Sequence, residues 1–294
     1  LKEAIDLRKI GIQQDILVLG AIPIEDLDLV IHYDITLSLF SKEYMAEIQK
    51  LYHHHKPVKV HIKIDTGMNR IGLKSKAEFE DILACCQNSM FQVDGVFTHF
   101  ATADDEMQND AYEQQIQMFY DIIGQHSFRY IHCQNSAAMM YHQDDRSNLA
   151  RIGIAMYGVD PSGEECQALK QVMSLYTRVS MIKQVKKGER IGYGLTYTAL
   201  EDEYIATLPI GYADGLIRAN QGREVYIEGH YYPIVGRVCM DQMMVKVDQN
   251  VHLHDRVEIF GEHITLARMA KELSTIPYEI VCLVSERVER IYKK

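Results

Sequence analysis

The sequence predicts an α/β protein with a further β domain: a TIM-type (β/α)8 barrel whose first two strands are missing, followed by a mainly antiparallel β domain. Two observations predict this. Up to residue 164, short apolar runs alternate with helix-like segments, as in parallel strands joined by helices. After the Pro161–Ser162–Gly163 break, strand-like runs follow one another with almost no helix between them. We therefore expect a barrel domain over 1–164 and a β domain over 165–294.

The first domain contains alternating strand and helix patterns. The expected strands are apolar runs at 16–21, 35–40, 58–65, 91–100, 130–136 and 151–158. The expected helices have apolar residues at three- and four-residue steps and cover 25–33, 42–54, 76–87 and 109–126. A complete barrel needs about 250 residues, so this domain holds about five or six of the eight units. The opening segment 1–11 resembles the end of a helix closed by Gly11, so we expect that upstream sequence is absent from the chain.

The second domain has a different pattern. Its expected strands are β-rich runs bounded by Gly, Asp and Asn, at 170–188, 203–212, 224–229, 231–241, 243–248 and 255–261. One helix is expected at 265–274, with Thr265 at its start.

Composition indicates a small-molecule enzyme. The formal net charge of -10 argues against a nucleic-acid or anionic-membrane surface, and no run approaches the roughly 18 apolar residues of a membrane helix. None of the six cysteines has C-x-x-C spacing, which favours a reducing cytoplasm. The run His53–His54–His55 is suited to a metal, but a solvated helix end is the favoured interpretation, so no metal is predicted.

Polar residues follow several of the barrel strands. The strand 58–65 runs into a glycine-marked loop, which makes Lys63, Asp65 and Arg70 candidate site residues. Other strand ends carry His99, the group His132 to Ser136, and Arg151. Ser136 and the backbone at Gly153 and Ile154 are suited to bind a phosphate, because glycine lets exposed N–H groups approach an anion. The alternatives are a solvated turn and structural histidines; several such groups at one sheet edge favour a site.

Two segments of the second domain are also candidates. Tyr193 lies between Gly192 and Gly194, which leaves space around its phenol, so it is suited to act as a general acid or base. The alternative is a turn tyrosine packed on a neighbour. The other segment contains Cys239, Met240 and Asp241, for which an ordinary strand end is the alternative.

Seven motifs, KIDTGMNRIG, THFATAD, HCQNSAA, RIGIAMYG, IGYGLTYTA, LPIGYADG and IVGRVCMDQ, occur in one order. In these motifs the chain resembles the pyridoxal-phosphate-dependent alanine racemases, which are fold-type III enzymes, over essentially its whole length. The resemblance implies a barrel followed by a β domain, in a homodimer whose active sites combine the barrel of one subunit with the second domain of the other. It also implies interconversion of L- and D-alanine through a pyridoxal-phosphate aldimine by a two-base mechanism, which supplies D-alanine for peptidoglycan.

The resemblance also implies residue roles. Arg151 should face the pyridine nitrogen of the cofactor. An arginine stays protonated, so it makes the cofactor a weaker electron sink. The phosphate should be held by Ser136, Gly153 and Ile154. The supporting hydrogen bonds to Arg151, and to Tyr193 of the partner subunit, should come from His99 and His132.

The substrate-binding roles come from the same resemblance. Tyr193 should be the base on one face of the substrate Cα. Arg70 and the backbone near Met240, between Cys239 and Asp241, should orient the substrate carboxylate. Lys63 should steady Arg70, as a carbamate in many relatives, and Tyr212 should belong to the narrow entrance.

The sequence departs from the family in two places. The second base is a lysine in a motif resembling VVKANAYGHG, which these 294 residues do not contain, so the chain as given is expected to be inactive. In LVSERVER, where relatives read close to ISYRVPR, Glu286 replaces a tyrosine, so strict alanine specificity is in question. A racemase of broader, serine-type specificity and a non-catalytic pyridoxal-phosphate-binding relative are the alternatives.

Overall fold

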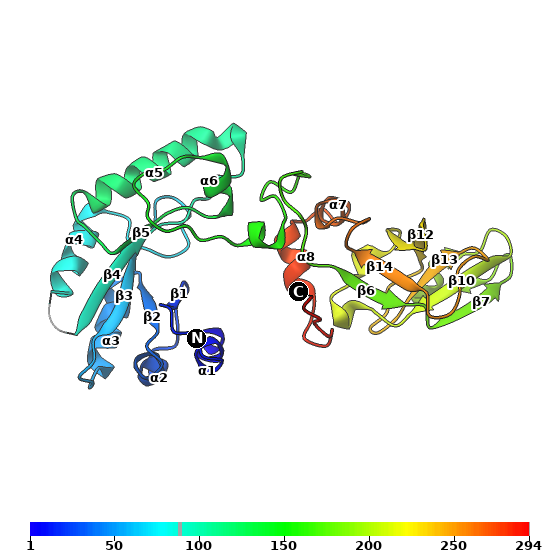
Figure 1. The fold of residues 1–294 in the computed structure, drawn as a ribbon, viewed down its shortest axis with the longest axis horizontal. Coiled ribbons are helices and arrows are strands. Elements are labelled where there is room, and N and C mark those ends of the chain that lie inside the picture. Colours follow the sequence, from blue (N-terminus) through cyan, green and yellow to red (C-terminus); the bar gives the residue numbers. More distant parts are fainter. Residues whose placement is uncertain (88–89, 294) are drawn as a thin grey trace. The chain divides into compact units, whose positions relative to one another are not determined.

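The computed structural model describes residues 1–87 and 90–293, and the chain divides into two units, Leu1–Ile152 and Gly153–Lys294 (Figure 1). Each unit has its own hydrophobic core. Among the described residues, no helix is long and apolar enough to cross a membrane.

The first unit is built on a parallel sheet. Within its described residues the sheet has five strands in the order β1-β2-β3-β4-β5, and every neighbouring pair is parallel. The strands are β1 (Leu17–Val18), β2 (Thr36–Leu39), β3 (Val58–Lys63), β4 (Phe91–Phe97) and β5 (Tyr130–His132). Strands that pair in sequence order form the wall of a barrel, whereas a doubly wound sheet changes direction in the middle. The predicted barrel-type fold is confirmed.

Helices alternate with these strands, and Figure 1 shows α3, α4 and α5 on one side of the sheet. The helices are α1 (Lys2–Lys9), η1 (Ile24–Asp26), α2 (Leu27–His32), α3 (Lys42–Leu51), α4 (Lys76–Cys85), η2 (Glu106–Gln108), α5 (Asn109–Ile123) and α6 (Ser136–Tyr141). Serine side chains cap the N-termini of two of these helices, α3 and α4. The Ser41 hydroxyl accepts from the Tyr44 N–H, and the Ser75 hydroxyl accepts from the Glu78 N–H. The helices pack on the sheet through residues such as Ile48, Phe79, Ile82 and Phe119.

Strand β3 is more deeply buried than its alternating sequence suggests. Alternation of apolar and charged residues usually marks a strand with one solvated face. Here His61 and Lys63, on the polar side of the alternation, are 5% and 3% exposed. The polar side chains of this strand are therefore enclosed within the unit. There, burial disfavours their charged forms, and they need hydrogen-bond partners within the protein.

The second unit is mainly antiparallel. Within its described residues, seven strands pair in the order β6-β14-β11-β12-β13-β10-β7, and β8 pairs with β9. The strands are β6 (Leu175–Arg178), β7 (Met181–Val185), β8 (Arg190–Ile191), β9 (Tyr197–Thr198), β10 (Glu203–Leu208), β11 (Glu224–Ile227), β12 (His230–Val235), β13 (Met243–Val247) and β14 (Arg256–Phe260). The helical elements are η3 (Ile154–Tyr157), η4 (Tyr193–Leu195), η5 (Tyr212–Asp214), η6 (Arg218–Asn220), α7 (Leu266–Glu272) and α8 (Pro277–Leu283).

Two details differ from the sequence-based expectations. The prediction of a strand at 151–158 is wrong. Ile154–Tyr157 forms the short helix η3, which lies between Gly153 and Gly158, and Gly158 has a left-handed backbone conformation. The second unit begins at Gly153, and Ile154 and Val159 pack in its core. Helix α7 was expected, but α8 was not predicted.

Candidate active site

Arg151 is held by acceptors at the ends of two neighbouring strands. Its Nη1 donates to His132 Nδ1 at 2.8 Å and to the His132 carbonyl at 2.9 Å. Its Nη2 donates to the carbonyls of Thr98 at 2.7 Å and Cys133 at 3.2 Å, and lies 3.4 Å from His99 Nδ1. Burial lowers the pKa of Arg151 to about 10, so the group remains protonated at neutral pH. The structure therefore brings together three predicted site residues, Arg151, His99 and His132.

A third histidine, His61, extends this group into the sheet. Because Arg151 can only donate, His132 Nδ1 must accept, and the ring proton of His132 therefore lies on Nε2. That nitrogen lies 2.8 Å from His61 Nδ1 and donates to it. Both imidazoles are buried, and burial lowers their pKa values, that of His61 to about 4. Two neutral imidazoles thus continue the hydrogen bonding of Arg151 to the middle of β3.

The sequence analysis did not single out His61. The signal that could have found it is strand periodicity, since His61 and Lys63 are two residues apart on β3 and face the same side. The space for the ring comes from Gly95, which is opposite His61 in the register. A Cβ on Gly95 would lie 2.8 Å from the His61 ring, so a larger residue there would displace it.

Lys63 lies in the same register row as Phe97 and His132. Its Nζ donates to the Ile64 carbonyl at 2.9 Å and lies 5.2 Å from the centre of the Phe97 ring, on which His132 stacks at 4.8 Å. Burial, and then the charge of Arg151, lower the pKa of Lys63 to about 7. A substantial fraction of Lys63 is therefore an uncharged, nucleophilic amine at neutral pH.

The loop after β3 is shaped by Asp65. Its Oδ1 accepts from the N–H groups of Gly67 and Asn69, both at 3.0 Å, so this carboxylate organises the turn. A Cβ on Gly72 would lie 2.7 Å from the Asp65 nitrogen, which explains the glycine. Arg70 is exposed at the tip of this loop. Within the described residues no hydrogen bond joins it to Lys63.

The expected phosphate-binding residues occupy separate elements. Ser136 is 2% exposed and begins α6, where the Asn135 side chain accepts from the Ala138 N–H at 2.9 Å. Gly153 caps η3, and Ile154 is buried in the core of the second unit.

Tyr193 is exposed in the second unit. Its side chain is 72% exposed in η4, which argues against a packed turn tyrosine. It lines a surface pocket of about 530 Å³ together with Cys239. A Cβ on Gly194 would lie 2.8 Å from Arg237 Nη1, so the glycine keeps the chain beside Tyr193 close to this arginine. The phenol is therefore presented to solvent on a constrained backbone.

The remaining candidates of the second unit lie beside one another. The Tyr212 N–H donates to the Cys239 carbonyl at 3.0 Å, and the next N–H along the chain donates to the Met240 carbonyl at 3.0 Å. Asp241 accepts from Arg287 at 2.7 Å, immediately after the exposed Glu286. One connected surface thus carries the expected entrance tyrosine, the Met240 segment and Glu286.

The buried imidazoles make the first unit sensitive to acid. Burial lowers the pKa values of His61 and His99 to about 4 and that of His132 further, while an unfolded chain binds protons near pH 6.5. Between pH 6.5 and 4 the unfolded state binds more protons, so stability falls as the pH falls. Each group contributes up to about 1.4 kcal/mol per pH unit.

Hydrogen exchange of the β4 and β5 amides from pH 7.5 to 5 checks this, because carboxylates titrate mainly below that window. His61→Gln is expected to reduce the pH dependence, whereas the matched variant His55→Gln, in an exposed loop, should leave it unchanged. Equal dependence in both variants and the wild type would contradict the assignment.

The two units together define the class of protein. A barrel-type sheet with cationic and imidazole groups at its strand ends, followed by an antiparallel β unit, is the architecture of a two-domain barrel enzyme. The family model described as "Alanine racemase, N-terminal domain" matches residues 1–161, and that described as "Alanine racemase, C-terminal domain" matches residues 172–292. The chain belongs to the alanine racemase family.

Individual relatives agree with this membership. The alanine racemase of Streptococcus uberis is 40% identical over 301 residues, which cover 99% of this chain and 82% of the relative. The crystal structure of the alanine racemase from E. faecalis matches with a TM-score of 0.92 and 38% identity, covering 98% of this chain and 80% of that one. The histidine racemase of Leuconostoc mesenteroides subsp. sake matches with a TM-score of 0.91 and 29% identity, covering 99% and 82%.

Proposed function

We propose that this protein is a pyridoxal-phosphate-dependent racemase that interconverts L- and D-alanine and supplies D-alanine for peptidoglycan. The observation that carries the proposal is the Arg151 group. A protonated guanidinium is fixed by backbone carbonyls and neutral imidazoles at the strand ends of a barrel-type sheet, in a chain of the alanine racemase family. The test is the formation of D-alanine from L-alanine in the presence of pyridoxal phosphate, measured by chiral chromatography on a form of the protein that also carries the family's lysine motif. The 294 residues alone, which do not contain that lysine, are expected to give no D-alanine.

The residues present fit this cofactor. Pyridoxal phosphate is anionic and carries a ring nitrogen that accepts hydrogen bonds, and the first unit offers hydrogen-bond donors from Arg151 and Ser136. We assign Arg151 to the ring nitrogen. We assign the phosphate to Ser136 and to the backbone of Gly153 and Ile154, following the family motifs. When bound, pyridoxal phosphate withdraws electrons from the substrate Cα. Arg151 keeps its own proton, which restrains that withdrawal and favours racemisation over side reactions.

Tyr193 is assigned to proton transfer on one face of the substrate Cα. Its Oη takes up or returns the proton, and its exposure on a constrained turn supports this role. Arg70 and the backbone near Met240 are assigned to the substrate carboxylate, and Tyr212 to the entrance. The neighbours Cys239 and Asp241 hold this segment through their contacts with Tyr212 and Arg287.

Lys63 is assigned to steadying Arg70 as a carbamate. At a pKa of about 7 its uncharged amine can attack the carbon of CO2, forming an N–C bond and releasing one proton to water. The product replaces a cation beside Arg70 with an anion, which converts repulsion into attraction.

Lys63 is therefore not expected to bond covalently to pyridoxal phosphate. Its Nζ is buried and donates to the Ile64 carbonyl, which restrains it from reaching a bound aldehyde. Borohydride reduction of the loaded protein, followed by peptide mass mapping, should give no pyridoxyl adduct on Lys63, and Lys63→Arg should leave the adduct pattern unchanged. A reduced adduct on Lys63 would show the assignment to be wrong.

We further propose a homodimer in which Tyr193 of one subunit serves the barrel of the other. The exposure of Tyr193 supports this, since a general base needs a partly enclosed site. Sedimentation of the purified protein should show a dimer. Mixing inactive Arg151→Leu and Tyr193→Phe proteins under exchange conditions should restore activity, because one site of each mixed dimer is intact. A monodisperse monomer, or no recovery after confirmed exchange, would contradict the shared site.

A racemase of broader specificity is the second candidate. Glu286 replaces a family tyrosine and lies next to Arg287, which pairs with Asp241, and one matching structure is a histidine racemase. Comparing kcat/KM for alanine, serine and histidine separates the candidates, with alanine expected to be preferred. Absence of racemisation for every amino acid in the lysine-containing form, with pyridoxal phosphate bound, would favour a non-catalytic relative. We also propose a cytoplasmic location, which is supported by the absence of C-x-x-C spacing among the six cysteines.

A further inference from the structure

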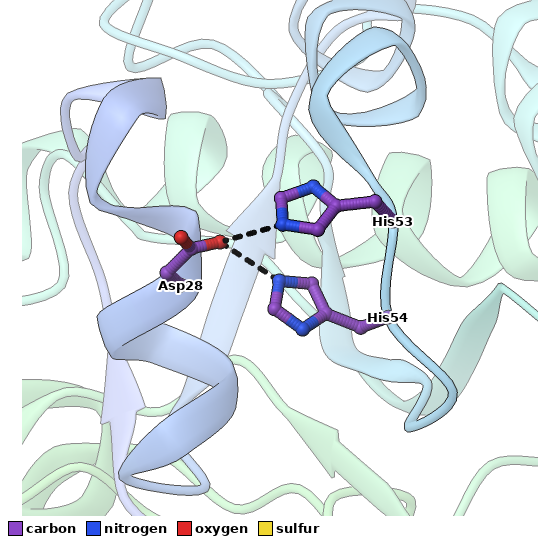
Figure 2. Close-up of side chains that lie close together, drawn as sticks. All are labelled: Asp28, His53 and His54. Carbon is purple, nitrogen blue, oxygen red and sulfur yellow. Dashed lines mark hydrogen bonds and ion pairs between the residues drawn. The ribbon is translucent and has the colours of Figure 1, made fainter.

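Three side chains outside the proposed active site converge on the surface of the first unit. Asp28 lies on α2, and His53 and His54 follow the end of α3 (Figure 2). Asp28 Oδ1 lies 2.8 Å from His54 Nε2 and 3.7 Å from His53 Nε2, and the potential ligand atoms of the three residues all lie within 4.8 Å of one another. Two imidazole nitrogens and one carboxylate oxygen thus face a single point.

We propose that Asp28, His53 and His54 form a binding site for a divalent transition-metal ion, with Zn²⁺ as the expected ion and water as the fourth ligand. Tetrahedral zinc bonds of about 2.0 to 2.1 Å place neighbouring ligand atoms about 3.4 Å apart. The two observed separations from Asp28 Oδ1 lie on either side of this value, so small side-chain rotations are sufficient. A set of two imidazoles and one carboxylate suits Zn²⁺, Ni²⁺ or Cu²⁺ rather than Mg²⁺ or Ca²⁺.

The backbone already orients one of the histidines. His53 Nδ1 lies 2.7 Å from the carbonyl of Leu51, the last residue of α3. Because a carbonyl only accepts, His53 Nδ1 carries the proton, and its Nε2 lone pair is directed toward Asp28. The two rings stack with centres 4.4 Å apart at 28°, which keeps their Nε2 atoms on one side. This arrangement is the outer-sphere support that metal-binding histidines commonly have.

The site joins two separate segments, and its exposure leaves it open to an ion. The side chains of His53 and Asp28 are 70% and 66% exposed. A bound ion would tie α2 to the segment that leads from α3 into β3. Binding to the folded state alone raises stability by linkage, so the expected role is stabilisation of the first unit.

His55 provides a matched control. It belongs to the same histidine run and lines a surface hollow of about 560 Å³ with Asp28 and His54, but it is outside the three-residue cluster. A nonspecific histidine run would use His55 as readily as His54, whereas the proposed site would not.

Isothermal titration of the full chain with ZnCl2 tests the proposal. One ion is expected per chain, and Asp28→Asn, His53→Gln and His54→Gln should each weaken binding by at least about tenfold. His55→Gln should keep the wild-type affinity, and MgCl2 should give no binding heat. Circular dichroism checks that the variants, which alter exposed side chains, are folded.

Thermal melting provides a second measurement, with ZnCl2 raising the melting temperature of the wild type and of His55→Gln but not of Asp28→Asn. Equal losses of affinity in His55→Gln and His54→Gln, unchanged affinity in Asp28→Asn, or no zinc binding by the wild type would each overturn the proposal.

Discussion

Replacing Tyr193 with phenylalanine, in a form of the protein that also carries the family's lysine motif, is expected to lower kcat for alanine racemisation by about 10²- to 10⁴-fold, with little change in the affinity for pyridoxal phosphate. The change removes only the phenol oxygen, which is assigned to moving one proton. The side chain is largely exposed, so its ring contributes little to the core and stability should be unchanged. Tyr204→Phe is the matched control, because Tyr204 is also an exposed tyrosine of the second unit but lies on β10.

Isotope exchange distinguishes a base from a structural tyrosine. In D2O, the Tyr193→Phe variant of the lysine-containing form should still exchange the α-hydrogen of one alanine enantiomer through that lysine and should lose exchange from the other. A packing tyrosine would instead give lowered stability and nearly equal effects on both enantiomers. Equal residual exchange from both enantiomers, or turnover like that of Tyr204→Phe, would remove Tyr193 from the catalytic residues.

Replacing Arg151 with leucine is expected to destabilise the first unit by about 2 to 4 kcal/mol and to weaken pyridoxal phosphate binding. The guanidinium donates to three backbone carbonyls and to His132, and leucine satisfies none of these buried acceptors. Hydrogen exchange of the β4 and β5 amides measures the loss in the first unit separately from the second.

Arg129→Leu is the matched control for Arg151→Leu. Arg129 pairs with Asp15 at 3.2 Å on the surface, and such a pair contributes about 1 kcal/mol or less. Arg151→Lys separates charge from geometry, since it keeps the cation but loses the planar fork that spans several acceptors. If Arg151→Leu destabilised the first unit no more than Arg129→Leu does, the proposed anchoring of Arg151 would be wrong.

The sequence by itself determined the type of each unit and the positions of most candidate side chains. Before residue 165 apolar residues recur at helical steps, and after it β-rich runs follow one another. Both patterns are periodicities of neighbouring residues, so a single sequence displays them. Lys63 and His132 end short apolar runs, so their location at strand ends was predictable, whereas the strand predicted to start at Arg151 does not form. Tyr193 was predictable from the glycines on either side of it.

Only the tertiary structure decided which of these groups are in contact and which of them are charged. His61 meets His132 because strand register aligns β3, β4 and β5 and because Gly95 leaves room, and neither is visible in a local pattern. The low pKa of Lys63 arises from burial on both faces of β3, where its alternating sequence suggested one solvated face. Asp28 and His53 lie far apart in the sequence and face each other only because α2 packs beside the end of α3. Periodicity specifies which face of an element is apolar, whereas contacts between distant segments depend on register, available space and burial.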